Sequence, residues 1–191
     1  MANMASIAYA IEGSEKSLKE IELAIILSKV DTKHWSEYTV CKILGFTDKE
    51  LDNYRLGGEI DEDAADNGQG VLKFYAEERW GLQDFHILLK KKFPDITVYW
   101  SVEEPGCAVY CTNDKESKYF PERYYAYVCI DGNYNSEYFP TEKALFEWLA
   151  KLTNNRVKSA EDIENFNADY ENSGNDDENF INVYEYALSN E

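Results

Sequence analysis

Apolar residues along this chain repeat with two different periods, and the order of these periods limits the folds that are possible. A period of two indicates strands, and a period of 3.6 indicates helices. Because the two patterns do not alternate strictly, we predict an α+β protein with a mixed or antiparallel sheet and helices packed on one face. The predicted order is strand 5–11, helix 17–29, helix 36–44, short helix 47–57, strand 71–78, helix 82–93, strands 96–102, 107–112, 124–130 and 137–139, helix 141–152, a short helix from Ser159, and strand 180–188.

Start and stop signals support these boundaries. Ser17 with Glu20, and Thr47 with Glu50, form capping-box patterns that open helices. The other signals are predicted caps at Thr141 and Ser159, a type II turn over Glu104–Cys107, and a turn at Gly132–Asn133.

Negative charge is concentrated at the carboxyl-terminal end. The formal net charge of the 191 residues is −18, and residues 159–191 contribute ten acids and no Lys or Arg. A smaller run at 61–70 has four acids and no base. The acidity therefore belongs to two segments and not to the whole fold.

We predict one α+β domain over residues 1–158, with a helical insert at about 34–58 and an acidic loop at 59–70. Residues 159–191 form an acidic C-terminal segment. A tail that serves only solubility needs little apolar surface, but this segment has much, so we expect it to dock on the domain. Its apolar and aromatic residues are Phe166, Tyr170, Phe180, Ile181, Val183, Tyr184, Tyr186 and Leu188.

The sequence gives no sign of a membrane span or a metal centre. No apolar run approaches the roughly 20 residues of a spanning helix, and the first ten residues lack the pattern of a signal peptide. We therefore expect a cytoplasmic protein with no membrane partner. Cys107 and Cys111 have no second ligand pair with zinc spacing, so we predict free thiols, no metal and no cofactor.

Direct binding to nucleic acid is not expected. Residues 39–55 have the outline of a helix-turn-helix, but its second helix offers more acids than bases, and DNA affinity rests on phosphate neutralisation by Lys and Arg. Residues 119–125 are aromatic with a single Arg, which favours sheet packing over an RNA-binding surface.

The sequence also does not match the known catalytic and calcium-binding motifs. An EF-hand loop from Asp61 would need different residues at 65, 66 and 72. His34 falls in a polar connection and His86 beside an apolar stripe, with no nucleophile motif near either. The neighbours Glu77 and Glu78 point to opposite faces of a strand, although an acid pair formed across strands stays possible. We lean toward a protein that is not an enzyme.

Two segments of the chain, "MANMASIAYAIEG" and "LKFYAEERW…FPDITVYWSVEEPGCAVYCTND", resemble a bacterial family carried by plasmids, phages and conjugative elements, whose members contain a YubB-type ferredoxin-like domain. The match covers residues 2–13 and 71–114, with Met4 where the family has Trp. It implies a ferredoxin-like fold and a mobile-element origin, but no activity and no iron–sulfur cluster. The matching positions are Trp80, Phe93, Pro94, Glu104 and Gly106.

These observations favour a non-enzymatic interaction or inhibitor protein with a DNA-mimicking acidic surface for a basic partner, such as a DNA-binding defence enzyme. The alternatives are a toxin-immunity type of binding protein with an aromatic surface, and a small hydrolase that uses carboxylates. The sequence does not decide the oligomeric state. The predicted partner-binding residues are Glu161, Asp162, Glu164, Asp169, Glu171, Asp176, Asp177 and Glu178.

Overall fold

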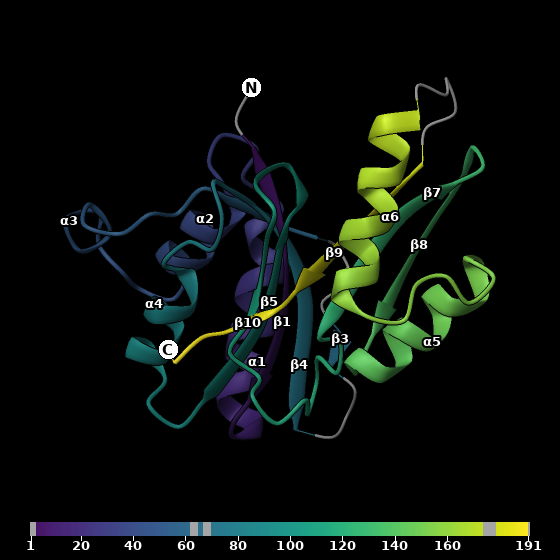
Figure 1. Cartoon of the computed structure of the whole chain (residues 1–191). Helices are drawn as coiled ribbons and strands as arrows, with labels where there is room; N and C mark the ends of the chain where they lie inside the picture. Colours follow the sequence, from purple (N-terminus) through teal and green to yellow (C-terminus); the bar gives the residue numbers. More distant parts are fainter. Residues whose placement is uncertain (1–2, 62–64, 67–69, 174–178, 191) are drawn as a thin grey trace. The chain divides into compact units, whose positions relative to one another are not determined.

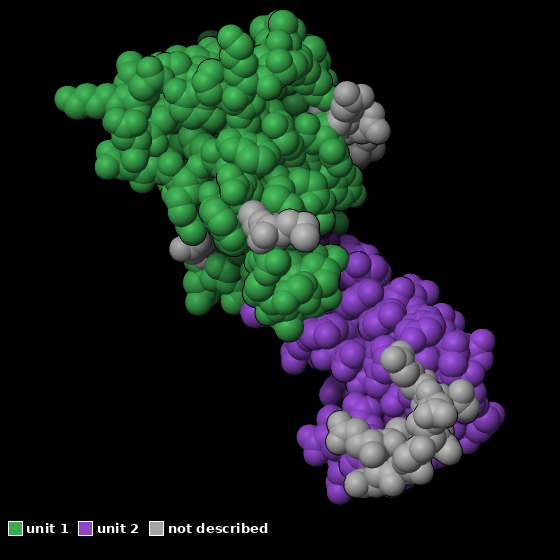
Figure 2. Space-filling model, turned by 90° about the horizontal axis from the view of Figure 1, so that it is seen from above, with its two compact units in different colours: residues 1–119, 188–191 green, residues 120–187 purple. Residues whose placement is uncertain are grey.

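A computed structural model describes residues 3–61, 65–66, 70–173 and 179–190. The chain forms two compact units, shown in different colours in Figure 2. Unit 1 comprises residues 1–119 and 188–191, and unit 2 comprises residues 120–187. The α+β class predicted from the sequence is confirmed, and each unit has its own sheet and its own core.

Unit 1 is built on a seven-stranded sheet in which β1 is central (Figure 1). The strand order is β10-β6-β5-β1-β4-β2, with β3 also paired to β4. Its elements are β1 (Met4–Glu12), α1 (Glu15–Ser28), α2 (Ser36–Ile43), α3 (Asp48–Leu51), β2 (Gly58–Ile60), β3 (Ala65–Asp66), β4 (Val71–Arg79), α4 (Phe85–Lys92), β5 (Thr97–Glu104), the 3-10 turn η1 (Pro105–Cys107), β6 (Val109–Thr112) and β10 (Ala187–Leu188).

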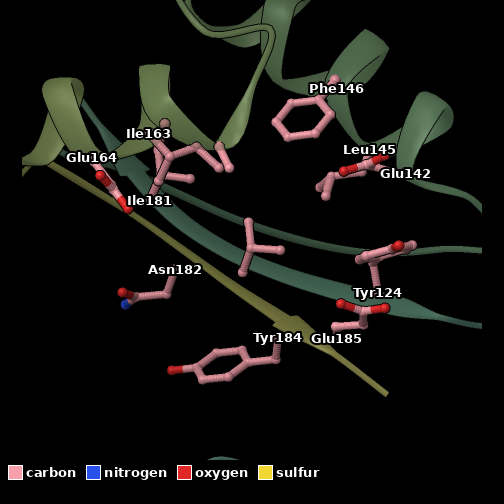
Figure 3. A pocket seen from close by; sticks show the side chains of 12 residues that line it. Tyr124, Glu142, Leu145, Phe146, Ile163, Glu164, Ile181, Asn182, Tyr184 and Glu185 are labelled. Atoms are coloured by element: carbon pink, nitrogen blue, oxygen red, sulfur yellow. The ribbon is translucent and has the colours of Figure 1, made fainter. Parts of the chain in front are cut away.

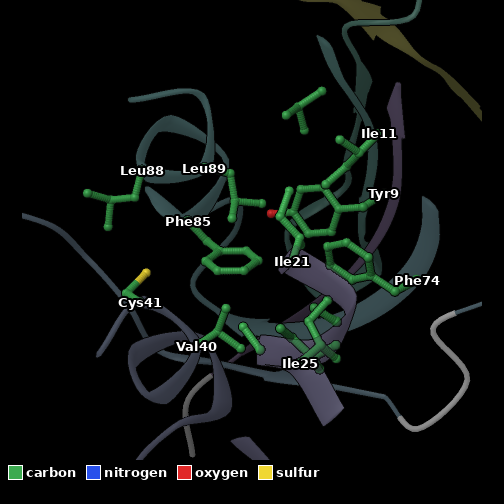
Figure 4. Packing of buried hydrophobic residues seen from close by; sticks show 14 of the residues in the cluster. Tyr9, Ile11, Ile21, Ile25, Val40, Cys41, Phe74, Phe85, Leu88 and Leu89 are labelled. Carbon is green, nitrogen blue, oxygen red and sulfur yellow. The ribbon is translucent and has the colours of Figure 1, made fainter. Parts of the chain in front are cut away.

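Alternation along β1 places its large apolar residues on the face that the helices cover. β1 runs antiparallel to both β4 and β5, so that Ile7 lies opposite Ala76 and Val102. Tyr9 stacks on Phe74 with ring centroids 4.9 Å apart (Figure 4). The rest of this core comes from α1, α2 and α4, through Ile21, Ile25, Val40, Phe85, Leu88 and Leu89. The finer, ferredoxin-like description of this unit stays a prediction.

Unit 2 has a three-stranded sheet in the order β8-β7-β9, with two helices on one face. Ala126 and Val128 of the central strand meet Leu149 of one helix and Phe166 of the other in a single core. The elements are β7 (Tyr124–Ile130), β8 (Asn133–Phe139), α5 (Glu142–Leu152), α6 (Ala160–Ser173) and β9 (Phe180–Glu185).

The division between the units differs from the boundary that we expected after residue 158. α6 and β9 belong to the same compact unit as β7, β8 and α5, because Phe166 and Ile181 complete the unit 2 core. The described acids of α6 and β9 are therefore part of a unit that begins at residue 120.

Three of the four helix caps predicted from the sequence are confirmed. Thr47 and Glu50 form the predicted capping box, and Thr141 caps α5 through the Ala144 N–H. The Asp162 N–H donates to Ser159 Oγ at the start of α6. The prediction for α1 was wrong: the cap is Ser14, whose side chain accepts the Ser17 N–H, so the helix begins at Glu15.

Two predicted turns have different geometry. The β5–β6 connection is a 3-10 turn followed by Ala108 at φ 53°, and it is not type II because Gly106 does not have a positive φ. It continues to Ala108 because β6 pairs Val109 with Glu104. The β7–β8 hairpin turns at Asp131–Gly132, both with positive φ, one residue before the predicted Gly132–Asn133, so β8 begins at Asn133 and not at 137.

The segment expected to be an acidic loop, 59–70, contributes two short strands to the sheet. β2 pairs Ile60 with Ala76, and β3 pairs Ala65 with Lys73, both on β4. Residues 62–64 and 67–69 of that segment lie outside the described residues. Among the helices that the structure describes, none combines the length and apolar character needed to cross a membrane.

Candidate functional site

An open groove lies in unit 2 between α5, α6 and strand β9 (Figure 3). Its volume is about 430 Å³, which is in the range of small-ligand and side-chain pockets. The lining combines apolar side chains with acids from three different elements: Glu142 from α5, Glu164 from α6 and Glu185 from β9. The apolar lining residues are Leu145, Phe146, Ala160, Ile163, Ile181 and Val183.

The local structure holds each acid in place. Glu142 is in the first turn of α5, directly after the cap Thr141. Glu164 is on α6, and the Asn167 side chain fixes this helix to β9: its Nδ2 donates to Ile181 O at 3.0 Å and its Oδ1 accepts from Ile181 N at 2.8 Å. These two hydrogen bonds join a helix side chain to a strand backbone, so they set the position of α6 along the groove.

Glu142 and Glu185 lie together at one end of the groove, beside Tyr124 (Figure 3). β7 pairs Tyr124 directly with Glu185 of β9. Burial raises the pKa of Tyr124, and the charges of Glu185 and Glu142 raise it further, so its hydroxyl stays protonated and donates to Glu185. Glu164 lies at the other end.

The described lining residues include no Lys or Arg to balance these carboxylates. An apolar floor with acids at both ends suits a group that is apolar along its length and positive at its tip. Lys and Arg side chains have this form, because a chain of methylene groups carries the charged head.

Of the eight predicted partner-binding residues, those whose side chains the structure describes are not gathered at one place. Glu164 lines the groove, and Glu161 is exposed on the first turn of α6. The backbone of Glu171 lies in α6, while its side chain and the residues Asp176, Asp177 and Glu178 fall outside the description.

Two of the predicted residues have partners within the unit. Asp162 Oδ2 accepts the Lys158 N–H at 2.8 Å, and this bond, followed by the Ser159 hydroxyl, lowers the pKa of Asp162. Asp169 forms an exposed ion pair with Arg156 at 3.7 Å. Such a pair contributes little to stability.

The sequence prediction missed Glu142, Glu185 and Tyr124, although Glu142 and Glu185 are two of the three acids that line the groove. The only local sequence feature that pointed to one of these residues was the position of Glu142 directly after the helix cap Thr141. Their convergence depends on the β7–β9 pairing, which joins residues far apart in the sequence.

A second acidic pair, also not singled out from the sequence, is buried in unit 1. Glu37 on α2 and Glu78 on β4 are both 0% exposed. Tyr9 Oη donates to Glu78 Oε1 at 2.6 Å, and the Gln83 backbone N–H donates to Glu78 Oε2. The Glu37 carboxyl lies beside the Glu78 carboxylate, and a hydrogen bond between the two side chains contributes to the pKa shifts of both.

Burial raises the pKa of Glu37 well above its usual range, and the neighbouring Glu78 carboxylate raises it further. Burial also raises the pKa of Glu78, against the opposing effect of its hydrogen-bond donors. Glu37 is therefore the protonated member of the pair. With no solvent exposure, the pair has no route to an external substrate.

Aromatic side chains line the other face of the unit 2 sheet. Ring centroids of Tyr125 and Tyr138 are 4.8 Å apart, and those of Tyr127 and Phe180 are 5.4 Å apart. Tyr134, 55% exposed, joins the same row at 6.1 Å from Tyr127. These rings are large and rigid, which is typical of contact residues at protein interfaces.

The histidines and cysteines show no arrangement typical of catalysis or metal binding. His34 Nδ1 pairs with Asp31, whereas His86 Nδ1 donates to the carbonyl of Gln83 at the edge of the core. Among the described residues, no three His, Cys, Asp or Glu side chains are grouped to hold a metal ion.

No protein-family model matches the chain, and neither does any curated protein or solved structure.

Proposed function

We propose that this chain is a non-enzymatic binding protein that captures a basic protein through the acidic groove of unit 2. The observation that carries the proposal is the convergence of Glu142, Glu164 and Glu185 on one apolar groove whose described lining has no base. Carboxylates held around an apolar floor attract a cation and also accept its aliphatic stem.

A nucleic-acid-binding protein is the basic partner that this chemistry favours. Its Lys and Arg side chains are arranged to neutralise a regular row of phosphates. α6 carries acids and no Lys or Arg from residue 160 to 173, and Glu161 is exposed beside the groove. The proposal is that these carboxylates take the place of phosphates, so that the partner is held away from DNA; a DNA-binding defence enzyme is one such partner.

The test compares groove acids with acids outside the groove. We expect the triple variant Glu142→Gln, Glu164→Gln, Glu185→Gln to bind a Lys/Arg-rich amphipathic peptide about 5- to 150-fold more weakly, from roughly 1–3 kcal/mol summed over three exposed ion pairs. Fluorescence anisotropy measures the affinity. The matched control is Glu137→Gln with Glu147→Gln, which removes exposed acids of unit 2 outside both α6 and the groove lining and should change affinity less than threefold, about 0.6 kcal/mol.

DNA competition tests the identity of the partner. Proteins captured from a bacterial lysate should include a nucleic-acid-binding protein that duplex DNA displaces and that about 0.5 M salt releases, since ion pairs with a polyanion-binding surface are screened. Capture that neither DNA nor salt affects contradicts the proposal. Deletion after residue 158 is not a clean test, because it removes Phe166 and Ile181 from the core of unit 2.

The aromatic row supports a second candidate, a toxin-immunity type of protein that binds through this sheet face. Tyr127 is 37% exposed and Tyr138 is 41% exposed, and rings of this kind are common binding hot spots. Under this alternative, Tyr134→Ser and Tyr138→Ser abolish partner capture while the triple Gln variant retains it.

The carboxylate hydrolase receives no support from Glu37 and Glu78, which are fully buried.

A further inference from the structure

α1 has a second apolar face that the core of unit 1 does not use. Leu23, Ile26, Leu27 and Val30 are spaced at i, i+3, i+4 and i+7, so they form one stripe along the helix and the residues just after it. Their exposed fractions are 55%, 54%, 47% and 83%.

The fold does not require this stripe. The opposite side of the helix carries Leu18, Ile21 and Ile25, which are buried in the core of unit 1. Figure 4 shows Ile21 and Ile25 in this packing. Polar residues at the exposed positions would leave that packing unchanged. Single exposed apolar residues are ordinary, but a contiguous row of large aliphatic side chains indicates a surface that another helix covers.

The charges beside the stripe indicate what that helix is. In the seven-residue repeat of a coiled coil, labelled a to g, Leu23 and Val30 occupy position a and Ile26 occupies position d. Glu22 and Lys29 occupy position g in successive repeats, so both lie on the same flank of the stripe. Two identical helices that run antiparallel bring g beside g, so Glu22 of each copy lies beside Lys29 of the other. A parallel pair would instead bring Glu22 beside Leu27, with no ion pair.

We propose that α1 is a self-association surface, on which two copies of this chain pack their Leu23–Val30 stripes antiparallel. The flanking charges complement each other only in that orientation, and they do so twice because of the two-fold symmetry. One helix stripe is smaller than the roughly 800 Å² per partner of a standard interface, so the expected dimer is weak, with a dissociation constant in the micromolar range, on the order of 10 µM.

Sedimentation velocity over a range of concentrations tests the dimer. We expect a monomer–dimer equilibrium that Ile26→Ser weakens by about tenfold or more, because an aliphatic contact is lost in each copy. The matched control is Ile87→Ser on α4, which removes an isoleucine with 42% exposure outside the stripe. Far-UV circular dichroism checks that each variant stays folded. A chain that is monomeric at every concentration, or a dimer that Ile26→Ser leaves unchanged, overturns the proposal.

A charge-swap cycle tests the orientation. Glu22→Lys and Lys29→Glu each create like-charge pairs in both copies, and each should weaken the dimer by about 3- to 10-fold. The double variant restores the opposite-charge pairs and should return to within about threefold of the original affinity. A double variant no better than the singles contradicts antiparallel packing. The assay needs no basic partner, so its failure leaves the groove proposal untouched.

Discussion

Glu37 shows at the residue scale how one buried proton couples to folding. Its carboxyl is fully buried beside Glu78, and the low-polarity surroundings favour the neutral form. Because the pKa of Glu37 is higher in the folded state than in the unfolded chain, the folded state binds more protons. The contribution of Glu37 to the unfolding free energy is therefore fully present at acid pH. It decreases as pH rises from the pKa of an unfolded Glu, about 4.3, toward the higher pKa of Glu37 in the folded state.

We therefore expect Glu37→Gln to remove the part of the decrease in unfolding free energy between acid and alkaline pH that comes from Glu37, while the part that comes from Glu78 stays. One proton changes the unfolding free energy by at most about 1.4 kcal/mol per pH unit, and the neutral amide has no proton to lose. Urea denaturation at a series of pH values measures the slope. The control Glu116→Gln changes an exposed carboxyl, and its slope should match the original protein. An unchanged slope in Glu37→Gln would show that Glu37 ionises normally in the fold.

Gly58 is the residue that makes room for this carboxyl. A Cβ at position 58 would lie 2.5 Å from Glu37 Cδ and 2.7 Å from both of its oxygens. We expect Gly58→Ala to lower the unfolding free energy by about 1–3 kcal/mol through overpacking. Gly57→Ala is the control, because its Cβ would meet nothing closer than Arg79 at 3.7 Å. Equal midpoints of denaturation for the two variants would contradict the predicted crowding.

At the scale of elements, unit 2 depends on how α6 is attached to β9. Both hydrogen bonds of Asn167 go to the backbone of Ile181, and Phe166 beside it enters the core. An apolar and a polar attachment of the helix therefore lie at adjacent residues. Glu164 lies on the same helix less than a turn earlier, so its place at the groove depends on this attachment.

Asn167→Ala should cost about 1–3 kcal/mol, since it leaves the Ile181 N–H and carbonyl without these partners. Hydrogen exchange should show faster exchange at the Ile181 amide and along α6. Asn165→Ala, two residues earlier and exposed, serves as the control. Protection that is equal in both variants would mean that the core alone fixes α6.

At the scale of the whole molecule, the two cores are separate sets of residues. Leu149 is 0% exposed in the unit 2 core. Leu149→Ala should cost about 2–5 kcal/mol, and hydrogen exchange should show the loss of protection within residues 120–187. Phe85→Ala is the reciprocal variant and acts on the unit 1 core. Equal loss of protection in both units from either variant would contradict independent cores.

Much of the fold followed from local patterns, whereas the site did not. Alternation predicted β1, and the helical period predicted α4 and α5, because each pattern reflects the burial of one face. The Asp131–Gly132 signal for a hairpin was present but was placed one residue late. The groove acids and the Glu37–Glu78 pair come together only through strand pairing and helix packing over long separations in the sequence, and no spacing rule contains that information.

The path of the chain through its two sheets has a practical consequence. Unit 2 is inserted between β6 and β10 of unit 1, and its two ends are neighbours, since the Tyr186 N–H donates to Arg123 O at 2.9 Å. A segment whose ends meet in this way can be cut out as a cassette and rejoined by a short linker, or moved into a loop of another protein. The acidic groove would travel with it, because every residue that lines it lies inside that cassette.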